Sequence, residues 1–137
     1  MDRAVSTLPS RALAPFAEHA YALLRIVSGA LFAFHGVQKV FGVLTDHQPA
    51  VGSQLWIGGV IELVCGALIA LGLYTRAAAF LASGTMAVAY FQFHWKLQLG
   101  ENFFPGVNKG EPAVVYCFLF LFVACKGAGR WSLGRRG

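Results

Sequence analysis

The chain has 137 residues, of which 57% are hydrophobic and only 12% are charged, and its formal net charge is +5. This composition is too apolar and too poor in charge for an ordinary water-soluble domain. The positive charge does not indicate a nucleic-acid partner, because the basic residues are not gathered on one soluble face. The composition therefore predicts one integral membrane domain that contacts the lipid bilayer.

Four apolar segments follow one another along the chain, and a helix of about 20 residues is needed to cross a bilayer. They run from Tyr21 to Leu44, Leu55 to Tyr74, Ala77 to Leu97, and Pro112 to Gly129. The fourth has the shortest apolar core, so it crosses only if Lys126 extends its side chain toward the interface. We expect an all-α fold in which residues 21–129 form an integral membrane four-helix bundle.

Both ends of the chain are polar. The first part, residues 1–20, contains two prolines and lacks the cleavage pattern of a signal peptide, so it is expected to be a flexible cytoplasmic tail. The last part, residues 130–137, is expected to be a basic cytoplasmic tail.

The basic residues divide unevenly between the two sides of such a bundle. Eight would lie on the side of the termini: Arg3, Arg11, Arg25, Arg76, Lys126, Arg130, Arg135 and Arg136. Three would lie on the other side: Lys39, Lys96 and Lys109. Because basic residues favour the cytoplasmic side, both termini are expected there, and the protein is expected to be a multi-pass protein of a bacterial inner membrane.

The most unusual residue is Glu62, which lies in the middle of the second apolar segment. A carboxylate at this depth is costly, so it normally faces the bundle interior, has a partner and marks a functional site. Gly58 and Gly66 lie four residues to either side, and such small residues let a neighbouring helix approach closely. Glu62 is therefore expected on a packed face.

Candidate partners for Glu62 lie on the first segment. His35 and Lys39 fall within one arc of about 120°, together with Arg25 and Gly36, when the residues are placed at 100° intervals. His35 is expected at about the depth of Glu62. Gln38 borders this arc.

Further polar and aromatic residues fall in the outer half of the bundle. Tyr90 and His94 share one face of the third segment. The connection from Gln98 to Glu111 carries Phe103 and Phe104, and it either folds back as a lid or anchors these rings among the headgroups. We expect a polar chamber on the extracytoplasmic side whose ligand-contacting residues are Gln38, Tyr90, His94, Phe103, Phe104 and Tyr116.

Three interpretations of the chamber remain open. The pairing of Glu62 with Lys39 or His35 would only neutralise charge and hold the helices together. A metal or haem site would use His35, His94 and Glu62, but no HxxxH or HExxH spacing supports it, and we assign no metal ligand. The favoured interpretation is a pocket in which Glu62, His35 and Lys39 act on a polar head such as a quinone ring.

Four stretches of the sequence, taken in order, resemble the DoxX family of small four-helix membrane proteins. They are RIVSGALFAFHGVQKVFG, GGVIELVCGALIALGLYTRAAA, ENFFPGVNKGEPAVVY and GAGRWSLG. The positions that match the family's recurrent residues are Arg25, His35, Gly36, Lys39, Glu62, Gly66, Arg76, Glu111 and Ser132. The chain has Gly134 where an aspartate is usual in the family, which puts any role of an acidic group there in doubt.

The resemblance implies a four-helix bundle associated with membrane redox chemistry, with a quinone as the possible cofactor and redox proteins as possible partners. An oxidoreductase subunit is one expectation, and Glu62 and His35 would then handle protons together. The alternative is a non-catalytic assembly factor or scaffold whose buried polar residues are structural. Self-association into a homo-oligomer is compatible with either function.

Overall fold

The structure, a computed structural model, describes residues 8–134, and these residues form helices and connections without any strand. The helices, in chain order, are α1 Leu8–Leu13, η1 Ala14–Phe16, α2 Ala17–Phe41, α3 Gln54–Leu71, α4 Thr75–Ala89, η2 Tyr90–Trp95, η3 Glu101–Phe103, α5 Pro105–Asn108 and α6 Glu111–Lys126. The predicted all-α class is confirmed. Helical structure begins earlier than expected, at Leu8, within the part of the chain that the sequence assigned to a tail.

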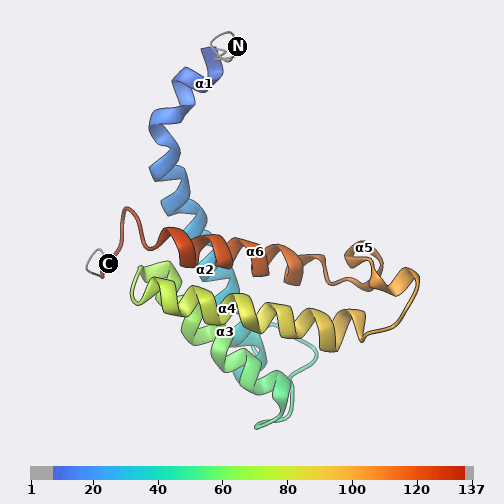
Figure 1. The fold of residues 1–137 in the computed structure, drawn as a ribbon. Helices are drawn as coiled ribbons and strands as arrows, with labels where there is room; N and C mark the ends of the chain where they lie inside the picture. The colour runs from blue at the N-terminus through green and yellow to red at the C-terminus, as the bar shows by residue number, and fades with distance from the viewer. Residues whose placement is uncertain (1–7, 135–137) are drawn as a thin grey trace.

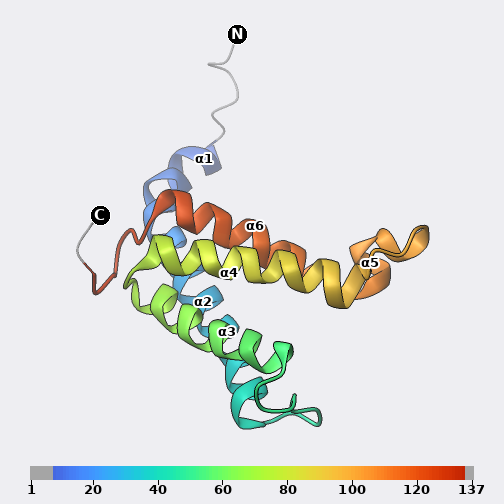
Figure 2. The ribbon, with the colours of Figure 1, turned by 60° about the horizontal axis from the view of Figure 1, so that its bottom comes forward.

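The long helices pack as two pairs. The contacts between α2 and α3 are the most extensive, those between α4 and α6 come next, and contacts between α3 and α4 join the two pairs. Figures 1 and 2 both show α4 and α6 running side by side, with α5 beyond their far end. The start of α2 and the end of α6 meet at the opposite end, where Tyr21 donates a hydrogen bond to the Gly127 carbonyl oxygen.

Glycines allow α2 and α3 to pack backbone against backbone. A methyl group at Gly36 would overlap the backbone of Leu63, and one at Gly66 would overlap the backbone of Ala33. At Gly29 an added Cβ would lie only 2.6 Å from the Ala70 nitrogen. Small residues at helix crossings permit this close approach. The expectation that Gly66 lies on a packed face is therefore confirmed.

Aromatic side chains fill the space between the two pairs. Phe32 of α2 is almost fully buried, and its ring centroid lies 4.8 Å from that of Phe120 on α6. Phe120 in turn stacks on Tyr116, with ring centroids 5.4 Å apart and planes inclined by 12°. Val123, also on α6, and Ile69 on α3 complete this buried core.

By length and hydropathy, two helices of the described chain could cross a membrane: Ser10–Phe41 and Gln54–Leu71. The helix α4 has 15 residues but continues directly into the π-helical η2, and α6 has 16 residues. Large apolar side chains on their outer faces, such as Phe80 and Phe118, are exposed, as expected for helices that contact lipid.

Candidate functional site

Glu62 of α3 forms an ion pair with Lys39 of α2. The Lys39 Nζ lies 2.7 Å from the Glu62 Oε1, and the exposed fractions of the two side chains are 32% and 4%. The second carboxylate oxygen, Oε2, is buried and has no hydrogen-bond partner in the described part of the chain. Lys39 thus neutralises the charge, while one acceptor of the carboxylate remains unused.

A groove of about 460 Å³ lies between α3 and α4 beside this ion pair. Its residues from α2 and α3 are Lys39, Gln54, Leu55, Ile57, Gly58, Ile61 and Glu62. Its residues from α4 and η2 are Phe80, Leu81, Gly84, Thr85, Met86, Val88, Ala89 and Phe93. The lining is mostly apolar and includes the Lys39–Glu62 ion pair, and apolar walls with a few polar groups are the usual character of a small-molecule site.

Two glycines keep the groove wide. A Cβ added to Gly58 on α3 or to Gly84 on α4 would meet no atom within 4 Å. These glycines differ from those at the α2–α3 crossing, because helix packing does not require them. The spacing of Gly58 suggested a packed face, but Gly58 lines the open groove instead.

His35 lies on a different face of α2. It is exposed, and its ring meets the Tyr116 ring of α6 edge-on at a centroid distance of 6.5 Å. The structure therefore brings Lys39 and Glu62 into direct contact and places His35 beside Tyr116.

Gln38 stabilises the end of α2. Its amide donates to the Leu44 carbonyl oxygen at 3.0 Å, just beyond Gly42, whose left-handed conformation (φ 67°) ends the helix. Gln38 is absent from the lining of the α3–α4 groove. Its contact with a ligand stays a prediction.

Tyr90, His94 and Phe103 gather at the outer end of α4 and η2. Tyr90 donates to the Phe103 carbonyl oxygen, and the Phe103 ring packs edge-on against Trp95 at 5.1 Å. Phe104 is largely exposed beside Phe103. The connection thus packs onto η2, and Figures 1 and 2 show α5 well away from the turn between α2 and α3.

Asn108 organises this connection, although the sequence analysis did not assign it a role. Its side-chain amide donates to the Asn102 carbonyl oxygen at 2.8 Å and to the Tyr90 hydroxyl at 3.3 Å. Its Oδ1 accepts from the Gly110 nitrogen at 2.8 Å, and its carbonyl oxygen lies 3.3 Å from the His94 Nδ1. Clusters of asparagine and glycine in a connection are a recognisable turn signal.

A second polar network joins the first half of α2 to the end of α6 and the segment that follows it. Arg25 is fully buried in α2, and its guanidinium donates to the carbonyl oxygens of Ala128, Arg130 and Trp131, the last at 2.8 Å. Arg76 donates to carbonyl oxygens at the C-terminus of α6. The motif GAGRWSLG therefore supplies backbone acceptors for a buried arginine.

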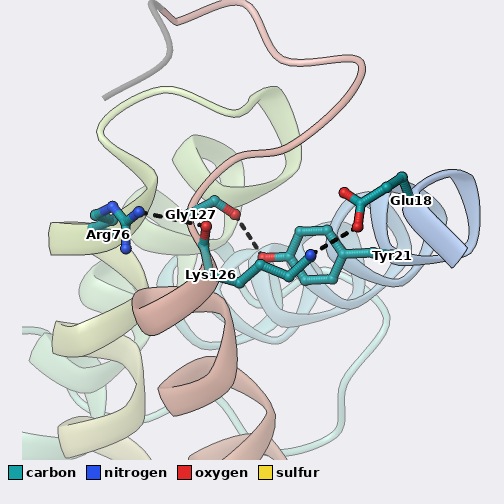
Figure 3. Close-up of polar contacts among 5 residues, drawn as sticks. All are labelled: Glu18, Tyr21, Arg76, Lys126 and Gly127. Carbon is teal, nitrogen blue, oxygen red and sulfur yellow. Dashed lines mark hydrogen bonds and ion pairs between the residues drawn. The ribbon is translucent and has the colours of Figure 1, made fainter.

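Figure 3 shows the neighbouring contacts of this network. The Tyr21 hydroxyl donates to the Gly127 carbonyl oxygen at 2.6 Å, and the Lys126 Nζ lies 2.9 Å from the Glu18 Oε1. Lys126 also lies over the Tyr21 ring, 5.0 Å from its centroid. These contacts fix the start of α2 to the end of α6.

Residues 8–134 contain no group of three or more His, Cys, Asp or Glu side chains close enough to hold a metal ion. In particular, His94 bonds within the outer connection, while Glu62 bonds to Lys39. The described contacts do not bring His35, His94 and Glu62 together as a ligand set.

Comparisons with known proteins agree with the motifs of the sequence. The DoxX family model matches residues 20–95, more than half of the chain. An uncharacterized protein of Haemophilus influenzae is 43% identical over 119 residues, which cover 84% of this chain and 88% of that protein. An uncharacterized membrane protein of Mycobacterium tuberculosis is 30% identical over 130 residues, which cover 82% of this chain and 78% of that protein.

No solved structure matches the chain. The family resemblance is nevertheless confirmed by the family model and by both relatives, and the candidate transmembrane helices agree with the description of the mycobacterial relative. The chain belongs to the DoxX family and is a membrane protein.

Proposed function

We propose that the groove between α3 and α4 binds a quinone or a similar membrane-soluble molecule, and that the protein is associated with redox chemistry in a bacterial inner membrane. The observation that carries this proposal is the buried Glu62 Oε2, which has no hydrogen-bond partner among residues 8–134 and belongs to a residue that lines an apolar groove of about 460 Å³. A buried acceptor without a partner is costly, and a ligand that donates a hydrogen bond removes this cost.

The chemistry of the ion pair suits a ring that carries hydroxyl or carbonyl oxygens. Glu62 Oε2 can accept a hydrogen bond from a ring hydroxyl, whereas Lys39 has further N–H groups that can donate to a ring carbonyl. When bound, the quinone supplies the redox chemistry. Glu62 and Lys39 then orient the ring and hold or release a proton at the Glu62 carboxylate.

His35 has a different position in this proposal. It is exposed beside Tyr116, so we assign it proton exchange with the surroundings and not direct contact with the ligand. Gln38, Tyr90, His94, Phe103 and Phe104 lie farther along the outer part of the molecule, where they can contact a tail or a redox partner.

The walls of the groove favour a ligand that comes from the lipid phase. Phe80, Leu81, Ile57 and Val88 line it and are also exposed on the outside of the helices. A molecule dissolved in the bilayer can therefore enter sideways between α3 and α4. An apolar tail would lie against these side chains while the head reaches Glu62.

The membrane arrangement belongs to the same proposal. We place all four long helices across the bilayer as a four-helix bundle, with both termini in the cytoplasm. The support is the uneven distribution of basic residues and the meeting of Tyr21 with Gly127 at one end. Cysteines introduced at Gln48 and Lys109 are expected to react with an impermeant reagent from outside, and labelling of either only from the cytoplasm would contradict the topology.

A non-catalytic assembly or scaffold role is the second candidate. It is favoured by one observation: Lys39 and Glu62 neutralise each other without a ligand, next to glycines at which α2 packs closely against α3. In that case the ion pair holds the fold, and a helix of a partner protein or of a second copy covers the open face of α3 and α4.

A steric block separates the two functions. Gly84→Leu and Gly58→Leu add bulk to the groove, and Gly106→Leu is the control because Gly106 also has open space around it but lies on α5. Each protein is purified in mild detergent from quinone-producing bacteria, and the extract is analysed by absorbance and mass spectrometry. We expect stoichiometric quinone in the wild type and the control and a loss of most of it in the groove variants.

The opposite result is equally clear. If the wild type carries no quinone and does not bind an added short-chain quinone, the redox proposal is wrong. If partner proteins co-purify with the wild type but not with Gly84→Leu, the assembly role is favoured.

A further inference from the structure

We propose that a second cavity, in front of the N-terminus of α4, binds the phosphate group of an anionic phospholipid. The cavity has a volume of about 500 Å³ and lies between the start of α4 and the segment that follows α6. It is lined by Gly72, Leu73, Tyr74, Thr75, Arg76, Ala77, Ala128 and Gly134. This site is separate from the α3–α4 groove and does not depend on the function proposed for that groove.

The start of α4 has no side-chain cap. Its N-cap residue, Tyr74, is in a left-handed conformation (φ 48°) and makes no capping hydrogen bond. The helical hydrogen-bond pattern begins with the Ala78 nitrogen, which donates to the Tyr74 carbonyl oxygen at 3.0 Å. The preceding N–H groups of the first turn have no helical acceptor, and together with the helix dipole they favour an anion.

Thr75 provides an independent indication of a ligand. This residue lines the cavity and is only 5% exposed, and its buried Oγ1 has no hydrogen-bond partner in the described chain. A buried hydroxyl normally has a partner. A phosphate oxygen at the start of α4 can accept a hydrogen bond from this hydroxyl as well as from backbone N–H groups.

The charge around the cavity also selects an anion. Arg76 contributes the only charged side chain among the described lining residues, and no acidic side chain is among them. Its guanidinium donates to carbonyl oxygens of α6, as Figure 3 shows for Lys126, so it is held in place next to the cavity. A fixed arginine at a helix N-terminus is well suited to a phosphate group.

A lipid is the favoured source of the phosphate. Tyr74, at the rim of the cavity, is 82% exposed, and Leu73 beside it is apolar. An exposed tyrosine next to apolar helices is typical of the level of the lipid headgroups. The acyl chains of a bound lipid would then run along the apolar outer faces of the helices.

Binding can be measured with the purified, delipidated protein in a neutral detergent. Native mass spectrometry and the shift in melting temperature are recorded with three probes: phosphatidylglycerol, diacylglycerol, which has the same chains but no phosphate, and inorganic phosphate. We expect phosphatidylglycerol to bind at one site and raise the melting temperature, and the other two probes to leave it unchanged.

Thr75→Val removes the hydroxyl with little change in shape and is expected to weaken phosphatidylglycerol binding about tenfold, the loss of one hydrogen bond to a charged group. Thr45→Val is the control for the same chemical change, because the Thr45 hydroxyl already accepts a hydrogen bond from the His47 nitrogen and Thr45 lines neither this cavity nor the α3–α4 groove. Ala77→Asp places a carboxylate in the first turn, so it is expected to raise the melting temperature without lipid and to abolish the lipid effect.

These variants also define the results that overturn the proposal. Equal affinity of wild type and Thr75→Val would do so, as would an equal loss of binding in Thr45→Val. If Thr75→Val does not fold, an undiminished lipid effect in Ala77→Asp overturns the site. Stabilisation by inorganic phosphate alone that disappears in Ala77→Asp would show that a soluble oxyanion, and not a lipid, is the ligand.

Discussion

Lys39 and Glu62 share a hydrogen bond of 2.7 Å, but only one oxygen of the carboxylate takes part in it. The Glu62 side chain is buried, whereas that of Lys39 is about one-third exposed. Removal of Lys39 is therefore expected to have a different effect from removal of the Glu62 charge. Without Lys39 a charge is left buried, whereas without the Glu62 charge the ammonium can still reach solvent.

The first prediction concerns this asymmetry. Lys39→Met is expected to lower the free energy of unfolding by about 1–3 kcal/mol, because it strands a buried carboxylate. Glu62→Gln is expected to cost less, and the double variant is expected to recover most of the loss caused by Lys39→Met. The measurement is reversible denaturation in detergent, analysed as a double-mutant cycle.

The control for this cycle is the Lys126–Glu18 pair, whose side chains are both substantially exposed. Glu18→Gln should leave the melting temperature almost unchanged, because an exposed ion pair contributes little. Strictly additive effects of Lys39→Met and Glu62→Gln would contradict a direct coupling of those two residues.

The second prediction contrasts two kinds of glycine. Gly36→Ala is expected to destabilise the protein by about 1–3 kcal/mol, because the added methyl group would overlap the backbone of Leu63 on α3. Gly58→Ala and Gly84→Ala are expected to be neutral or to stabilise by up to about 1 kcal/mol, because both sites are open and alanine favours the helix. Thermal denaturation of the three variants tests whether Gly36→Ala lowers the stability while Gly58→Ala and Gly84→Ala leave it unchanged or raise it.

The third prediction concerns the junction of α2 and α6. Tyr21→Phe keeps the edge-on ring contact with Phe122 but removes the 2.6 Å hydrogen bond to the Gly127 carbonyl oxygen. We expect a loss of about 0.5–1.5 kcal/mol. Tyr74→Phe, at a largely exposed tyrosine, is the control and should have no effect in lipid-free detergent. Equal stability of Tyr21→Phe and wild type would show that water replaces the bond.

Much of the helical framework could be predicted, because apolar segments of sufficient length and the spacing of small residues are local features of the sequence. The estimate of depth on α2 was also accurate: Gly36, the neighbour of His35, lies against Leu63, the neighbour of Glu62. Both depths follow from the constant rise of a helix. The rise does not tell which neighbouring helix each side chain of α2 contacts.

The arc of about 120° that contains His35 and Lys39 spans two contact faces of α2. Lys39 and Gly36 face α3, whereas His35 and Phe32 face α6, where both meet Tyr116. His35 and Lys39 lie four residues apart and differ by only about 40° around the helix, so a small rotation of α2 decides which of the two side chains reaches Glu62. This rotation depends on tertiary packing, which one sequence does not specify.

The outer connection shows a similar limit. Its aromatic residues allowed either a lid or an anchor among the headgroups, and in the structure Phe103 contacts Trp95 and Tyr90 of the neighbouring helix η2. Backbone groups of the connection bond to one another and to the side chains of Asn102 and Asn108. The sequence predicted a turn in this connection, but it did not predict how far the connection lies from α2 and α3.

The last prediction concerns Arg25, which is buried in α2 and holds the segment after α6. In Arg25→Met the carbonyl oxygens of Ala128, Arg130 and Trp131 lose their charged donor, so this segment is expected to detach while the helices remain folded. Its detachment exposes the nitrogens of Leu133 and Gly134, which bond the Leu71 and Gly72 carbonyl oxygens at 2.9 and 3.1 Å.

Hydrogen–deuterium exchange followed by mass spectrometry measures this detachment directly. A bond to a charged donor contributes about 1.5–3 kcal/mol, so exchange at Leu133 and Gly134 is expected to accelerate at least about tenfold in Arg25→Met. Arg25→Lys should give an intermediate rate, because an ammonium keeps the charge but cannot span several carbonyl oxygens as the planar guanidinium does. Unchanged exchange in Arg25→Met would mean that the bonds to α3 hold the segment without the arginine.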